Sequence, residues 1–172
     1  MNAENTQKIK RLVLTGMLFA TAIVLSVIED LIQLPVAAPG VKFGLSNIVV
    51  MYSLFFLGGR TAFLVSVLKS SYVFISRGLI ASILSLCGGL LSIAVMLLLL
   101  KIFKDRVSYL ILSISGAIFH NLGQLIAVSL IYSGLVWIVN FPLLMISGVL
   151  AGIATATLLK VFLPAFKKLN LK

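Results

Sequence analysis

The residues best suited to chemistry in this sequence are polar side chains that interrupt long apolar stretches. In the segment HNLGQ, His120 and Gln124 are four residues apart and would share one face of a helix, with Asn121 beside them. Imidazole and amide groups both donate and accept hydrogen bonds, so this face could bind a polar ligand. Alternatively, the same groups could hold the helix against its neighbours, as buried polar side chains commonly do.

Charged residues interrupt the apolar stretches at three further places. Glu29 and Asp30 end the first stretch. Lys69 lies within a later stretch, and Arg77 follows that stretch. Lipid cannot solvate such groups, so they are expected to face the interior of a bundle or a water-filled cavity. Two alternatives stay open. The carboxylates could cap the first helix and pair with Lys42 or Arg77, and Lys69 could extend its charge toward the membrane surface.

A polar segment, PGVKFGLSN at residues 39–47, separates the first two apolar stretches. Its proline and glycine residues break a helix, and Ser46 and Asn47 could cap the next one. The N-terminus of a helix attracts anions. Lys42 and Asn47 are therefore predicted to contact an anionic or strongly polar part of a ligand. The alternative is a capped turn in which Lys42 pairs with Glu29 or Asp30.

The composition is that of a membrane protein. The chain of 172 residues is 61% hydrophobic and only 10% charged, whereas soluble domains carry about 25% charged residues. The net charge is +10, but the basic residues are scattered at the ends of apolar stretches, where they encode membrane topology. Nucleic-acid binding is therefore not expected.

The apolar stretches predict an all-α integral membrane protein whose six transmembrane helices form a single domain over residues 1–172. The predicted helices cover residues 9–32, 43–57, 61–76, 79–100, 107–132 and 141–162. Six crossings put both termini on one side of the membrane. That side would hold eleven basic residues against two on the other. Positive charge favours the cytoplasmic side, so cytoplasmic termini in a multi-pass protein of the cytoplasmic membrane are predicted.

The eleven basic residues on the predicted cytoplasmic side are Lys8, Lys10, Arg11, Arg60, Lys101, Lys104, Arg106, Lys160, Lys167, Lys168 and Lys172, and the two outer ones are Lys42 and Arg77. The depth of a residue in the membrane can be measured along its helix, from the basic residue at the cytoplasmic end, at 1.5 Å per residue. On this measure Glu29, Arg77 and His120 lie about 27, 25 and 21 Å deep, and Lys69 about 13 Å. These polar residues thus cluster in the outer half of the bundle, which predicts a polar cavity that opens to the outside.

The predicted substrate-binding residues are Glu29, Asp30, Lys42, Ser46, Asn47, Lys69, Arg77, His120, Asn121 and Gln124. No metal is expected, because the one histidine has no second soft ligand nearby, and no cofactor is expected either. The sequence contains no phosphate-binding loop motif and only four acidic residues. An enzyme acting on prenyl diphosphates needs several carboxylates to hold its magnesium ions. The chain is therefore not expected to be an enzyme by itself.

Small residues recur along three of the predicted helices. These residues are Gly16 and Ala20 in the first helix, Ser113, Gly116, Gly123 and Ala127 in the fifth, and Gly148, Gly152 and Ala156 in the sixth. Such stripes let helices approach each other closely. They are expected to serve mainly internal packing, and one of them could receive an outside partner.

Three segments, IEDLIQLPVAAPGVKFGLSNIVVMYSLFFLG, CGGLLSIAVM and SGAIFHNLGQLIAV, resemble the Gx transporter family, whose members are often labelled heptaprenyl diphosphate synthase component I. The resemblance covers roughly residues 10–165. The family looks related to the substrate-binding S components of energy-coupling factor (ECF) transporters. It implies a six-helix protein that binds a small solute from outside, with the first external loop forming part of the site and lid. It also implies docking on a coupling protein, with two ATPases, through small residues that correspond to Gly16 and Ala20.

The sequence thus predicts a membrane-embedded, non-catalytic subunit that binds a small organic solute for transport and contacts membrane lipid. Two other functions stay open. One is an accessory subunit, component I, that holds a lipid-like substrate for a soluble enzyme of an isoprenoid or quinone pathway. The other is a structural anchor for a membrane redox assembly.

Overall fold

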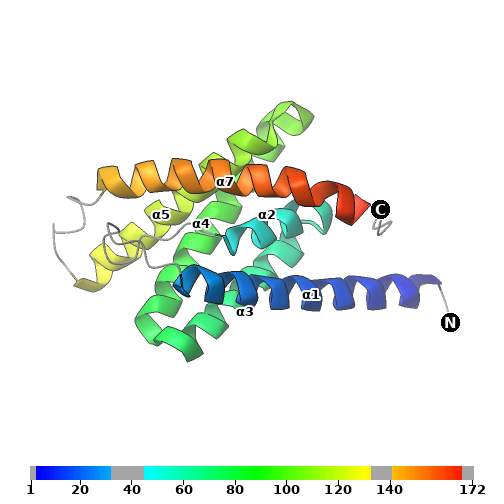
Figure 1. Cartoon of the computed structure of the whole chain (residues 1–172), viewed down its shortest axis with the longest axis horizontal. Helices are drawn as coiled ribbons and strands as arrows, with labels where there is room; N and C mark the ends of the chain where they lie inside the picture. Colours follow the sequence, from blue (N-terminus) through cyan, green and yellow to red (C-terminus); the bar gives the residue numbers. More distant parts are fainter. Residues whose placement is uncertain (1–2, 32–44, 133–140, 168–172) are drawn as a thin grey trace.

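The computed structural model describes residues 3–31, 45–132 and 141–167, and within these ranges the chain is helical apart from short turns. The elements are α1 (Ala3–Leu31), α2 (Asn47–Phe56), α3 (Gly59–Arg77), α4 (Leu79–Phe103), the short 3-10 helix η1 (Lys104–Arg106), α5 (Tyr109–Tyr132) and α7 (Phe141–Lys167). The predicted all-α class is confirmed for the described residues. Figure 1 shows the six α-helices packed side by side in one bundle.

Four of these helices are long and apolar enough to cross a membrane. The qualifying stretches are Glu4–Glu29, Leu79–Phe103, Tyr109–Tyr132 and Phe141–Val161. The shortest of them has 21 residues and spans about 31 Å, which matches a hydrocarbon core of about 30 Å. These stretches belong to α1, α4, α5 and α7, so the chain has the helices of a membrane protein.

The outside of the bundle is apolar. The exposed fractions of Leu12, Ile75 and Leu130 are 73%, 83% and 78%. Water would make so much apolar exposure unfavourable, whereas lipid tails solvate it. In contrast, Lys69 and His120 are buried in the interior. This distribution of polarity is the one expected for a bundle that lies in a bilayer.

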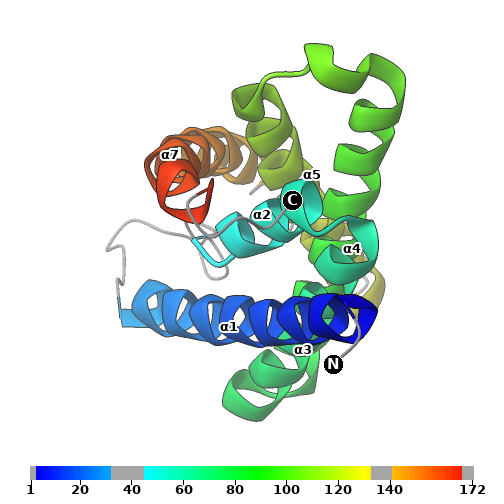
Figure 2. The same ribbon diagram turned by 90° about the vertical axis from the view of Figure 1, so that its right-hand side faces the viewer.

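Helix α2 is shorter than the predicted helix over residues 43–57. It has 10 residues, and residues 45 and 46 before it form a turn. Its length of about 15 Å is half the thickness of the hydrocarbon core. Every residue from Ile48 to Leu54 is buried. Figure 2 shows α2 between α1 and α7, and it contacts each of the other five α-helices. Thus α2 is a core helix, surrounded by protein.

Three of the long helices, α1, α4 and α7, extend beyond the predicted ends on the side where the basic residues lie. α1 begins at Ala3, α4 continues to Phe103 and α7 to Lys167. The predicted boundaries were placed where charge begins. Lysine and arginine are good helix formers, however, so a helix does not stop where its hydrophobicity does. The beginning of α1 and the end of α7 lie at the same end of the bundle (Figure 1).

Glycines hold α4, α5 and α7 close together. A Cβ atom built on Gly123 in α5 would lie 2.8 Å from the carbonyl oxygen of Cys87 and 2.9 Å from the Cα of Gly88. A Cβ on Gly152 in α7 would lie 2.5 Å from the Cα of Ile114. Side chains do not fit at such distances, so the stripes of α5 and α7 serve internal packing. Gly16 differs, because a Cβ there would meet no atom of the described residues within 4 Å.

We therefore expect Gly123→Ala to lower the free energy of unfolding by about 1–3 kcal/mol, because the added methyl group forces α4 and α5 apart. Gly16→Ala is the matched control. It should leave stability unchanged or raise it by up to about 1 kcal/mol, since alanine favours an exposed helix over glycine. Denaturant unfolding of the purified variants in detergent measures both effects. Equal stability of the two variants would contradict the close approach at Gly123.

Candidate functional site

A cavity of about 490 Å³ lies inside the bundle, and all six α-helices contribute to its wall. Eight of the ten predicted site residues line it: Glu29, Ser46, Asn47, Lys69, Arg77, His120, Asn121 and Gln124. Lys42 lies outside the described residues, and the side chain of Asp30 is not described either. The fold thus brings polar residues from α1, α2, α3 and α5 to one place. Contact of these residues with a ligand stays a prediction.

Lys69 is buried in the middle of α3, with an exposed fraction of 7%. Its Nζ atom donates a hydrogen bond of 2.9 Å to Oδ1 of Asn47 at the start of α2. The carboxylate of Glu29 on α1 is close enough to interact electrostatically with Lys69 and with Arg77. Of the two interpretations that the sequence left open for Lys69, burial in the bundle is therefore the correct one.

Ser46 and Asn47 do not cap α2 as the sequence suggested. Ser46 occupies the N-cap position, but its side chain makes no capping hydrogen bond. Its backbone is already helical, with φ −63° and ψ −20°, whereas an N-cap residue usually has extended angles that aim its oxygen at the first amides. The Ser46 hydroxyl instead donates to Oε2 of Glu29 at 3.4 Å. Both residues thus connect α2 to its neighbours.

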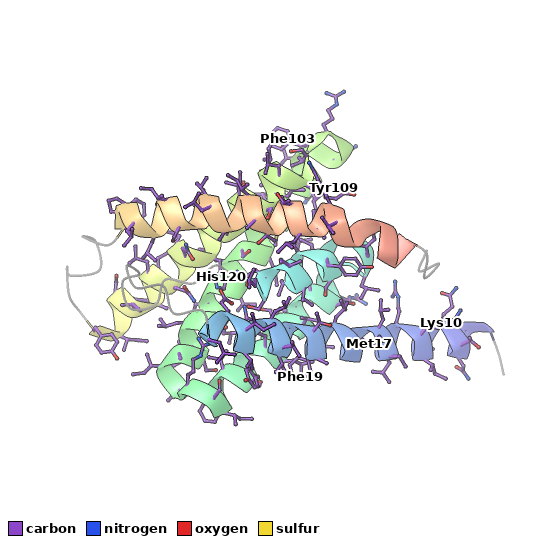
Figure 3. The ribbon with its side chains drawn as sticks, viewed as in Figure 1. Lys10, Met17, Phe19, Phe103, Tyr109 and His120 are labelled. Carbon is purple, nitrogen blue, oxygen red and sulfur yellow. The ribbon has the colours of Figure 1, made fainter. Side chains whose placement is uncertain are left out.

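The residues of HNLGQ divide between packing and the cavity. The amide nitrogen of Asn121 donates to the carbonyl oxygen of Leu144 at 2.8 Å and so ties α5 to α7. His120 lies in the interior of the bundle (Figure 3), where its ring contacts Gly88. The backbone of Gly88 interacts electrostatically with the imidazole, but Nδ1 has no partner in hydrogen-bonding geometry among the described residues. His120 is therefore held against α4 at Gly88, with Nδ1 buried in that contact.

Several residues that line the cavity were not among the predicted site residues. They are the hydroxyl-bearing Ser26, Ser85, Ser92, Ser113 and Thr155, and the two methionines Met51 and Met96. Serine and threonine are common in membrane helices, where they bond to their own backbone, so they give little signal. One clue was present, because Ser113 and Gly116 share the helical face of His120.

The described part of the cavity offers charge and hydrogen bonds but no metal site. The described residues contain no group of three or more His, Cys, Asp or Glu side chains that could hold a metal ion. The arrangement is therefore suited to holding a polar or charged molecule among apolar walls. Outside the cavity, Gly16 and Ala20 are exposed on α1, so this small-residue stripe is open to a neighbour.

A family model described as heptaprenyl diphosphate synthase component I matches residues 18–162. This match confirms the resemblance seen in the sequence. The matched range contains all eight described site residues that line the cavity, and it begins after Gly16. A search of curated proteins and a search of solved structures each gave no match.

The hydrogen bond between Lys69 and Asn47 predicts a coupling in stability. We expect Asn47→Ala to destabilise the protein by about 1.5–3 kcal/mol, because it leaves a buried ammonium without its acceptor. The same change in a Lys69→Met background should have a much smaller effect. Unfolding of the wild type, both single variants and the double variant gives the coupling energy. A coupling energy near zero would mean that this hydrogen bond contributes nothing to the fold.

Proposed function

The chain belongs to the heptaprenyl diphosphate synthase component I family, and we propose that it is a membrane-embedded, non-catalytic subunit that binds a small organic solute for transport across the cytoplasmic membrane. The observation that carries this proposal is the cavity. Its volume of about 490 Å³ falls within the range of about 300–1,000 Å³ for small-molecule sites. Buried ionisable groups such as Lys69 and Glu29 are costly inside a membrane bundle and usually mark a functional site. A structural anchor would need neither feature.

The topology that fits this role has six crossings and both termini in the cytoplasm. Three observations support it: α1 begins and α7 ends at the same end of the bundle, α1 carries Lys8, Lys10 and Arg11 at its beginning, and η1 contributes Lys104 and Arg106. Positive charge in short connections favours the cytoplasmic side. In this arrangement α2 and α3 cross as a pair, with α2 surrounded by protein.

Transport would require a partner that supplies energy. We propose a coupling protein with two ATPases, as in the ECF transporters that the family resembles, because the chain itself has no phosphate-binding loop motif. The exposed face of α1 around Gly16 and Ala20 would receive the coupling protein. Small residues there allow close helix contact without a clash.

A second candidate function follows from the description of the family. The chain could hold a prenyl-diphosphate-like substrate for a soluble enzyme, without catalysing the reaction. The cavity gives this some support, since it combines the cations Lys69 and Arg77 with apolar residues such as Leu84, Leu125 and Val128. The identity of the bound molecule distinguishes the two candidates.

The test is mass spectrometry of the small molecules that co-purify with the protein in lipid nanodiscs. A metabolite should accompany the wild type and the exposed control variant Lys101→Met, and Lys69→Met should lose it. A bound prenyl diphosphate would favour the accessory role. A wild-type protein that carries lipid alone would contradict solute binding.

Cysteine labelling in intact cells tests the topology. In a Cys87→Ser background, Leu79→Cys follows the turn between α3 and α4 and should react with a membrane-impermeant thiol reagent added outside. Lys101→Cys, near the end of α4, should react only after the membrane is permeabilised. The opposite pattern would reverse the proposed orientation of the bundle in the membrane.

A further inference from the structure

Contacts between the helices show which parts of the cavity lie at the same depth. In the pair α3 and α4, a Cβ atom on Gly89 would touch the hydroxyl of Ser66, and one on Gly59 would lie 3.3 Å from Leu97. These helices are antiparallel, so residue numbers rise along one helix in the direction in which they fall along the other. Lys69 therefore lies level with about residue 86 of α4. Its neighbour at this level on α5 is His120, which contacts Gly88.

A second group of cavity residues lies deeper, toward the end of the bundle where α1 begins. Ser92 is six residues beyond the level of Lys69, or about 9 Å along α4. A Cβ on Gly116 of α5 would lie 3.2 Å from the Ser92 hydroxyl and 2.9 Å from the sulfur of Met96. On α7, the Gly152 carbonyl accepts a hydrogen bond from Ser113. We call the part of the cavity lined by Ser92, Met96, Ser113, Gly116 and Thr155 the inner chamber.

Charge is distributed unevenly between these two levels. Among the residues that the structure describes, the charged ones that line the cavity are Glu29, Lys69 and Arg77, all from α1 and α3. Arg77 is eight residues from Lys69, about 12 Å toward the opposite end from the inner chamber. The described residues of the inner chamber present hydroxyl groups, a thioether and a glycine, without any charge. An acid group in the inner chamber would therefore find no cation among the described residues that line it.

The ammonium of Lys69 has unused capacity for an anion. It carries three N–H donors, and Asn47 is its one hydrogen-bond partner among the described residues. Because Oδ1 of Asn47 accepts this bond, its amide NH₂ group lies on the other side of the same side chain. The imidazole of His120 also lines the cavity, within electrostatic range of Lys69. Charge-assisted hydrogen bonds to an acid group would satisfy such a buried ammonium.

We propose that the bound solute is an organic acid whose acid group lies at Lys69 and Asn47 and whose uncharged remainder occupies the inner chamber. This inference rests on the binding role proposed above and adds the chemical class and the orientation of the solute. The hydroxyl groups of Ser92 and Thr155 would contact polar atoms of the uncharged part. Met96, which is flexible, would adapt to its shape.

Matched small molecules test the class of the solute. The probes are phenylacetate and hydrocinnamate, their primary amides, the corresponding amines, and acetate, which has an acid group without a large remainder. Titration calorimetry with the protein in nanodiscs should show the two aromatic acids binding about tenfold or more tightly than their amides or amines, since a hydrogen bond to a charged group is worth this much. Equal affinity across the three classes, or no binding of either acid, would overturn the inference.

Two sets of variants test the orientation. Lys69→Met and Lys69→Gln should each weaken binding of the aromatic acids about tenfold or more, whereas the exposed Lys101→Met should not. Gly116→Val narrows the inner chamber, so it should weaken the aromatic acids but leave acetate unchanged, and Gly16→Val is its control on the outer face. Unchanged binding of the acids by folded Lys69→Gln, or an equal loss of acetate in Gly116→Val, would contradict the orientation.

The test of the acid assignment can fail while the proposed solute-binding function is supported. A neutral or cationic metabolite that co-purifies with the wild type and is lost in the Lys69 variants would support solute binding. It would contradict the assignment of the solute as an acid. If no metabolite co-purifies and no probe binds, both the solute-binding function and the acid assignment are contradicted.

Discussion

The buried ammonium of Lys69 constrains the structure more than any other group. Lipid surrounds the bundle and offers no hydrogen bonds, so the charge has to find its polar partners inside the protein. Asn47 supplies one, which places the beginning of α2 against the middle of α3. Glu29 supplies compensating charge from α1 and accepts a hydrogen bond from Ser46. The beginning of the short helix α2 thus joins α1 and α3 around this charge, while its apolar residues pack into the core of the bundle.

The contacts that join the helices differ between the two sides of the cavity. Helices α4, α5 and α7 are joined by close contacts at glycines and by side-chain bonds to the backbone, such as that from Asn121 to Leu144. Helices α1, α2 and α3 share an apolar core that includes Leu18, Val50 and Val65, and charged and amide groups join them where α2 begins. Dense packing excludes voids, whereas polar groups that face one another leave room for water or a solute. The cavity lies between these two groups of helices and takes its charge from one and its uncharged wall from the other.

The sequence revealed the general plan because polar residues inside apolar stretches are rare and informative. It indicated the membrane class, the four long apolar helices and eight residues that prove to line one cavity. The length of α2 was harder to predict, since a continuous apolar run is typical of a core helix as much as of a membrane helix. The contact of Ser46 with Glu29 depends on tertiary structure, which local capping rules do not include. Ser92 and Thr155 gave no signal because hydroxyl groups are tolerated anywhere in a membrane helix.

The polarity of α3 has a consequence for how the chain enters the bilayer during synthesis. α3 contains Arg60, Lys69 and Arg77 and is not among the helices apolar enough to insert by composition alone. α2, which precedes it, is too short to hold a place in the membrane by itself. A translocon that releases segments into lipid according to their hydrophobicity would retain this pair. α2 and α3 therefore depend on the strongly apolar α1 before them and α4 after them, and integration of the nascent chain becomes a cooperative event of four helices.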